Sequence, residues 1–78
     1  MSNPQEPPVL DWRNVIHKSV RTKDRIALGN VAAEDGDSIT VSGPRSKFYK
    51  IPKSLVETYD GAEVRLSLKR EDLVHYEA

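Results

Sequence analysis

The segment from Lys18 to Val31 limits the fold of this chain more than any other stretch, because it has the pattern of two short strands joined by a charged bend. Apolar residues there are separated by charged or polar ones, as in strands that bury one face. Gly29 interrupts the second strand and predicts a β-bulge or the sharp coil of a small barrel. The bend is predicted at Lys23–Arg25, and the predicted buried residues are Val20, Ile26, Leu28 and Val31.

Three later stretches alternate in the same way and predict further strands at 38–42, 47–51 and 63–68. Asp35-Gly36 precedes the first of them and is a strong signal for a hairpin turn. In the stretch 47–51, strict alternation places Tyr49 on the inner face together with Ile51. The other two residues, Phe48 and Lys50, are predicted to face outward, which leaves one aromatic side chain exposed.

The segments around these strands are predicted to be turns. Residues 52–61 begin with Pro52 and end with Asp60-Gly61, which fits one or two helical turns. Residues 69–73 have the composition of a turn, and 74–76 fit a short closing strand or a frayed end. Five or six short strands at about 10-residue spacing predict an all-β fold, a small closed or partly closed antiparallel β-barrel with one short helical turn.

The two ends of the chain differ in composition. Residues 1–9 hold three of the five prolines and predict a mobile tail, and residues 10–78 predict a single domain. Asp11 is placed to cap a helical turn that begins at Trp12. Trp12 is predicted to close one end of the core, with an exposed anchor for a partner as the alternative.

The composition excludes several classes of protein. A chain of 78 residues buries a small core, so self-association would help it and a homodimer is expected. There is no cysteine, and the formal net charge is zero, which argues against binding to nucleic acid by bulk charge alone. Because no apolar run approaches the ~18 residues of a membrane span and the start lacks a signal-peptide pattern, we expect no membrane insertion and a cytoplasmic location.

The sequence contains no catalytic signature, so we expect no enzymatic activity and no cofactor. His17 and His75 are the only histidines, and neither has the spacing of a metal ligand cluster. The loop Ser42–Lys47 has some features of a phosphate-binding loop but lacks the strand-loop-helix context that such loops need. A polar hairpin turn is the simpler interpretation of that loop.

Two parts of the chain resemble the PRC-barrel family. The run HKSVRTKDRIALGNV is similar to the opening hairpin of that family, with its acidic bend and its hydrophobic-Gly-x-Val closure at Leu28–Val31. The run YKIPKSLVETYDGAEVRLSLKREDL is similar to its second half. The matching positions there are Ile51-Pro52, Ser54, Val56, Asp60-Gly61, Val64, Leu66 and Leu73.

This resemblance covers about residues 16–75, and it implies a barrel fold and protein binding rather than catalysis. The family includes the cytoplasmic domain of the photosynthetic reaction centre H subunit, the C-terminal domain of a bacterial ribosome maturation factor, and small stand-alone prokaryotic proteins. Some archaeal members are associated with cell division. The resemblance therefore implies an adaptor or scaffold, in cell division or in another assembly.

Basic residues gather in two segments of the sequence. Residues 13–25 contain five basic side chains against one acidic one, and residues 45–53 contain four with no acid. If the two segments meet on one face, that face could bind single-stranded nucleic acid, with Phe48 and Tyr49 as stacking platforms. The simpler interpretation is a set of solvated strand faces whose lysines discourage edge-to-edge pairing.

Two functional hypotheses follow from the sequence. The first is a non-enzymatic module that binds another protein or a larger assembly through an exposed strand edge or through Phe48 and its basic strand. The alternative is RNA or DNA binding, with a link to ribosome maturation, through the basic face. The candidate partner-binding residues are Trp12, Arg21, Lys23, Arg45, Lys47, Phe48 and Lys50.

Overall fold

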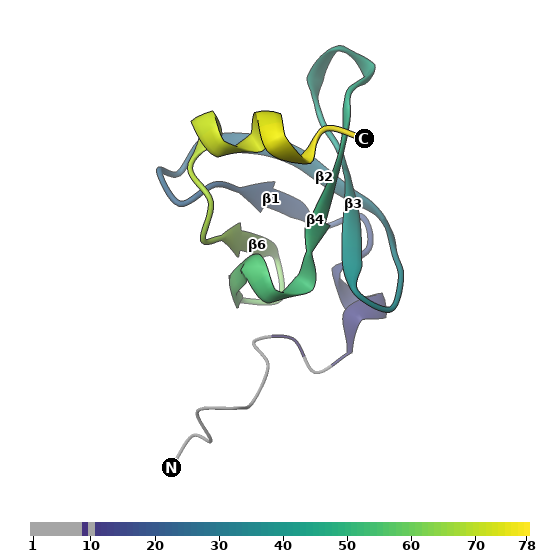
Figure 1. The fold of residues 1–78 in the computed structure, drawn as a ribbon. Helices are drawn as coiled ribbons and strands as arrows, with labels where there is room; N and C mark the ends of the chain where they lie inside the picture. The colour runs from purple at the N-terminus through teal and green to yellow at the C-terminus, as the bar shows by residue number, and fades with distance from the viewer. Residues whose placement is uncertain (1–8, 10) are drawn as a thin grey trace.

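A computed structural model describes residue 9 and residues 11–78 (Figure 1). The predicted mobile tail therefore lies outside the described residues except at Val9, which is buried in the core. The strands are β1 (Ser19–Arg21), β2 (Ala27–Glu34), β3 (Ser38–Ser42), β4 (Phe48–Pro52), β5 (Val56–Tyr59) and β6 (Glu63–Leu66). Short 3₁₀ helices are η1 (Trp12–Val15), η2 (Pro44–Ser46), η3 (Lys53–Leu55) and η4 (Arg70–Tyr76).

The six strands form one sheet in the order β4-β3-β2-β1-β6-β5. The predicted all-β fold is confirmed to the extent that the structure is mostly β and built of short strands, but the antiparallel barrel is wrong in two respects. β1 and β6 pair in parallel, with Val20 opposite Val64, whereas the other neighbouring pairs are antiparallel. The edge strands β4 and β5 do not pair with each other, so the sheet is not closed into a barrel. Alternation specifies which face of a strand is buried, and it does not specify the direction of a non-local neighbour.

The core is made of the inward residues of the strands together with residues from η1 and η4. Most of the alternation-based predictions are confirmed: Ile39, Val41 and Ile51 are fully buried and Tyr49 is 9% exposed. Trp12 is half-buried and packs against this core, as predicted. Among the described residues, the buried hydrophobic residues of this core are Val9, Val15, Val20, Leu28, Val31, Ile39, Val41, Tyr49, Ile51, Val56, Val64, Leu66 and Leu73.

Ile26 is an exception, because it was predicted to be buried and is 39% exposed. It lies in the β1–β2 turn, where its N–H donates to the Thr22 hydroxyl at 3.1 Å and its carbonyl accepts from the Thr22 N–H at 3.0 Å. Thr22 is fully buried and takes the inner position at this end of the hairpin. The apolar side chain of Ile26 is left on the surface.

The predicted bulge at Gly29 is confirmed. The β1–β2 register shifts between Val20 and Arg21, which pair with Gly29 and Ala27. Gly29 has a φ of +154°, and a Cβ atom on it would lie 1.9 Å from the Ser42 carbonyl oxygen. β2 can therefore coil past the end of β3 only where it has no side chain.

Two segments near the C-terminus form other elements than predicted. Residues 52–61 contain the single turn η3 followed by β5, because Val56 and Tyr59 pair with Leu66 and Val64 across a hairpin. Residues 70–76 form η4 rather than a turn and a closing strand, and Leu73 anchors η4 in the core with 3% exposure. After η4, the Ala78 N–H donates to the Phe48 carbonyl at 2.8 Å, beside β4.

No helix in the described part of the chain has the length and apolar character needed to cross a membrane.

The predicted turn at Asp35-Gly36 connects β2 to β3, and the Asp35 carboxylate organises it. One of its oxygens accepts from the Ser38 N–H at 2.9 Å and from the Asp37 N–H at 3.0 Å. These backbone hydrogen bonds, with that of the Ser38 hydroxyl, lower the pKa of Asp35. Hydrogen bonds to the ionised form favour it, so the charged carboxylate stabilises the folded state.

Replacing Asp35 with alanine is expected to reduce stability at neutral pH and to make stability less sensitive to acid. Since the pKa of Asp35 is lowered on folding, its contribution is fully present above the unfolded-state pKa and is lost as the pH falls through the folded-state pKa. Urea unfolding over a pH series measures this. Asp37→Ala is the matched control in the same turn, and an equal loss at all pH values for Asp35→Ala would contradict the prediction.

Candidate interaction surface

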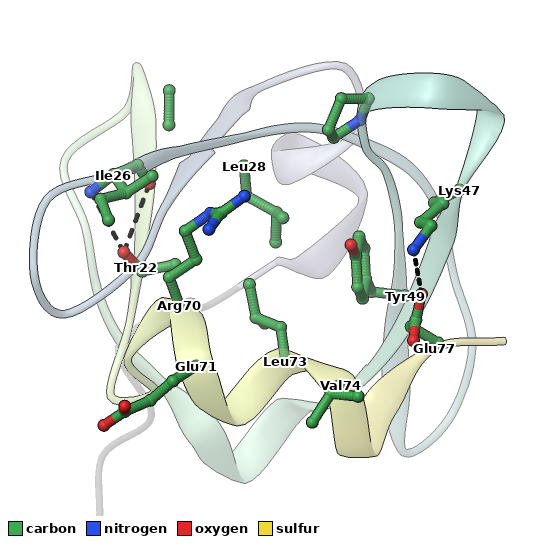
Figure 2. Close-up of a pocket in the computed structure, with 12 residues that line it drawn as sticks. Thr22, Ile26, Leu28, Lys47, Tyr49, Arg70, Glu71, Leu73, Val74 and Glu77 are labelled. Atoms are coloured by element: carbon green, nitrogen blue, oxygen red, sulfur yellow. Dashed lines mark hydrogen bonds and ion pairs between the residues drawn. The ribbon is translucent and has the colours of Figure 1, made fainter.

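A groove of about 440 Å³ opens beside η4 (Figure 2). We call it the η4 groove. It lies between η4, the β1–β2 turn and the tip of the β3–β4 hairpin, so three separate parts of the sequence contribute to it. Its lining residues are Thr22, Ile26, Ala27, Leu28, Pro44, Lys47, Tyr49, Arg70, Glu71, Leu73, Val74 and Glu77.

The η4 groove collects exposed apolar surface. The large apolar residues that are exposed in the described part of the chain are Ile26 at 39%, Phe48 at 45% and Val74 at 63%. Two of the three, Ile26 and Val74, line this groove. In Figure 2 the Leu73 side chain points from η4 into the cavity, with the Tyr49 ring on one side. The groove therefore has an apolar floor that is continuous with the core.

Charged side chains stand at two sides of the η4 groove. On one side the Lys47 ammonium lies 2.8 Å from the Glu77 carboxylate, which raises the pKa of Lys47 through their hydrogen bond. On the other side Arg70 points into the cavity, whereas Glu71 points away from it (Figure 2). No carboxylate of the described residues lies within ion-pair distance of the Arg70 guanidinium, although the Arg70 N–H donates to Asp24 at 3.2 Å.

Phe48 and Lys50 face outward from β4, as alternation predicted, on the side opposite to Tyr49. β4 is an edge strand of the sheet. Lys50 lies 3.8 Å from Asp35 across the neighbouring turn. The predicted exposed aromatic residue is therefore present, but it lies outside the η4 groove.

Five of the nine basic residues predicted to form one face are paired with acidic residues. Arg21 contacts Glu63 at 2.7 Å, and Lys53 contacts Glu34 at 2.9 Å while its ammonium lies 4.9 Å from the Trp12 ring centroid. Lys47 and Lys50 have the acidic partners given above. Long-range ion pairs of this kind interrupt the predicted basic surface.

Lys23 and Arg45 make no ion pair with the described residues. Lys23 lies in the β1–β2 turn, next to Thr22 of the η4 groove, and Arg45 lies at the tip of the β3–β4 hairpin. Arg45 has a φ of +60° in that tight turn. Of the predicted partner-binding residues, only Lys47 lines the η4 groove itself.

Sequence patterns did not single out Ile26, Arg70 or Val74 as surface candidates. Ile26 matches the apolar pattern of a strand, and Val74 lies in a segment predicted to be a short closing strand or a frayed end. Arg70 was part of an ordinary charged turn. Their grouping results from the packing of η4 on the sheet, which has no local sequence signal.

Within the described residues there is no group of three or more His, Asp or Glu side chains that could hold a metal ion. The chain was compared with protein-family models, with curated proteins and with solved structures, and none of the three comparisons gave a match.

Proposed function

We propose that this domain is a non-enzymatic protein-interaction module that binds a short partner segment in the η4 groove. The observation that carries the proposal is the pairing of exposed Ile26 and Val74 in one cavity, with the Arg70 guanidinium pointing into it. Burial of apolar surface is the main driving force of association, and an exposed apolar cavity with a few polar groups is typical of a binding site.

The chemistry of the η4 groove defines the partner segment. Apolar surface of the partner would cover Ile26 and Val74, which lie on opposite sides of the cavity, and would rest on the buried floor at Leu73 between them (Figure 2). An Asp or Glu nearby would pair with Arg70, whose planar guanidinium can bind a carboxylate through two hydrogen bonds. We therefore propose a partner segment that combines an apolar residue with an acidic one.

The other polar groups of the η4 groove support binding rather than catalysis. The Thr22 hydroxyl is hydrogen-bonded to the Asp24 carboxylate and to the Ile26 backbone. Side chains that are fixed in this way suit a preorganised surface. The resemblance to the PRC-barrel family implies an adaptor function, and the small size of the chain favours a homodimer; both stay predictions.

Selection of random short peptides on the immobilised domain tests the proposal, followed by affinity measurement for the selected peptides. Val74→Asp is expected to weaken binding about tenfold or more, because it removes apolar contact and places a negative charge beside the acidic residue of the peptide. Since Val74 is 63% exposed, the thermal midpoint of the Val74→Asp variant should stay close to that of the wild type. Arg70→Glu should weaken binding in the same way.

Phe48→Ala is the matched comparison, because Phe48 is the exposed apolar residue outside the η4 groove. If Phe48→Ala weakens binding and Val74→Asp does not, the outer face of β4 is the contact and the groove proposal is wrong. A set of selected peptides rich in Lys and Arg would also contradict it. The nucleic-acid alternative predicts binding to single-stranded oligonucleotides that falls steeply with salt, and this is measured in parallel.

A further inference from the structure

The exposed edge of β4 has backbone groups that point away from the sheet. The Gly43 N–H donates to the Lys47 carbonyl at 2.8 Å, and the Lys53 N–H donates to the Asp37 carbonyl at 2.8 Å. The backbone groups of residues 47 and 53 therefore point toward β3. In an antiparallel pair every second residue of a strand bonds to the neighbouring strand, and the residues between them point their backbone groups the other way. The N–H and C=O groups of Phe48 and Lys50 consequently point to the open side.

The chain's own C-terminal residues already lie on part of this edge. Glu77 is opposite Tyr49 in an antiparallel bridge, and the Ala78 N–H donates to the Phe48 carbonyl. The contact is short, because it is one isolated bridge, and its ion pair between Lys47 and Glu77 is solvent-exposed, with side-chain exposures of 54% and 36%. Exposed pairs of this kind contribute little to stability. Residues 77–78, which we call the strap, are therefore held weakly on β4.

Two hollows lie on either side of this strap. Glu77 lines the η4 groove together with Lys47 and Tyr49. It also lines a second, more open hollow of about 680 Å³, which includes Lys50, Pro52 and residues 75–78. The strap therefore stands between two cavities that both border β4.

We propose that the partner segment of the η4 groove binds as an extended strand along β4, in the place of residues 77–78. This inference rests on the proposed function and names the conformation of the partner. An added strand would bond to the outward groups of Phe48 and Lys50, and a side chain in the position of Glu77 would point toward the η4 groove beside Lys47. Because Glu77 occupies that position as an acid, a partner Asp or Glu suits it.

The edge itself sets the length of the added strand. β4 ends at Pro52, which has no N–H to donate, and the hairpin tip at η2 ends it on the other side. The site thus offers the backbone groups of Phe48 and Lys50 to a short strand. Specificity would then come from alternate side chains, one set facing the η4 groove and the other lying beside Phe48.

Lys50→Pro with Lys50→Ala as its control tests this inference. Proline removes the outward N–H of residue 50 and leaves the β3 side of the strand unchanged, so Lys50→Pro is expected to weaken binding of the tightest selected peptide tenfold or more. Lys50→Ala keeps that N–H and is expected to bind within about twofold of the wild type. Equal affinities of the two variants would overturn the inference.

Amide hydrogen exchange of the wild-type domain gives a second test that does not depend on the folding of a variant. On adding the same peptide, the Ala78 amide is expected to exchange faster because the strap is displaced, and the Phe48 and Lys50 amides are expected to exchange more slowly. A peptide that binds, is lost on Val74→Asp and leaves these three amides unchanged would contradict strand addition while the proposed function stands. If no peptide is selected, both proposals fail.

Discussion

Replacing Gly29 with alanine is expected to lower the free energy of unfolding by about 3 to 5 kcal/mol, the sum of backbone strain and overpacking. The φ of +154° is one that residues with a side chain rarely adopt. The added methyl group would also lie 1.9 Å from the Ser42 carbonyl oxygen, which is backbone and cannot rotate away. A domain of this size has a total stability of roughly 4 to 12 kcal/mol, so the variant should lose a large share of it.

Two other glycines separate these two contributions. Gly61 has a φ of +93° but open space around it, so Gly61→Ala should cost about 1 to 2 kcal/mol from the backbone conformation alone. Gly36 has no contact within 4 Å and no positive φ, so Gly36→Ala should change stability little. Urea unfolding of the three variants measures the series. If Gly29→Ala lost no more stability than Gly61→Ala, β3 would have moved to accommodate the methyl group, and the close approach would not be a constraint of the fold.

The elements that sequence reasoning predicted well are those with a local pattern. The sequences of β3 and β4 alternate around Ile39 and Tyr49. The Asp35-Gly36 turn makes β2 the antiparallel neighbour of β3. Gly29 was recognised because an isolated glycine in a strand needs a geometric reason, which the bulge provides. In these places the face of each side chain follows from the period of two along a strand.

The elements that were missed depend on non-local packing. β5 is four residues long and directly follows the single turn η3, so its pattern could not be told from a helical turn until its partner β6 was known. The parallel pairing of β1 with β6 has no signal in either strand. The exposure of Ile26 follows from Thr22, a polar residue that is buried because its hydroxyl and backbone are satisfied in the turn.

The candidate site shows the same division. Alternation predicted that Phe48 would be exposed, and the structure places it so. The predicted basic face, in contrast, joins residues such as Arg21 and Lys53 whose acidic partners lie far away in the sequence. The η4 groove could not be predicted, because Ile26 and Val74 come to line one cavity only when η4 packs through Leu73.

Replacing Tyr49 with alanine is expected to cost about 3 to 5 kcal/mol, as for other buried aromatic residues. Tyr49 is 9% exposed and lies in the core cluster, and its ring also forms one wall of the η4 groove. The ring packs close to the Gly43 backbone, because a Cβ atom on Gly43 would lie 2.8 Å from it. Removal of the ring should therefore loosen the β3–β4 hairpin as well as the core.

Phe48→Ala is the matched control for Tyr49→Ala, because the two aromatic residues are neighbours on β4 and face opposite sides. Phe48 is 45% exposed, so its truncation should leave the thermal midpoint nearly unchanged. Thermal unfolding of both variants measures the difference. A large drop in the midpoint for Phe48→Ala would mean that the outer face of β4 is covered in solution, and dependence of that midpoint on protein concentration would identify a second copy of the chain as the cover, since association stabilises by mass action.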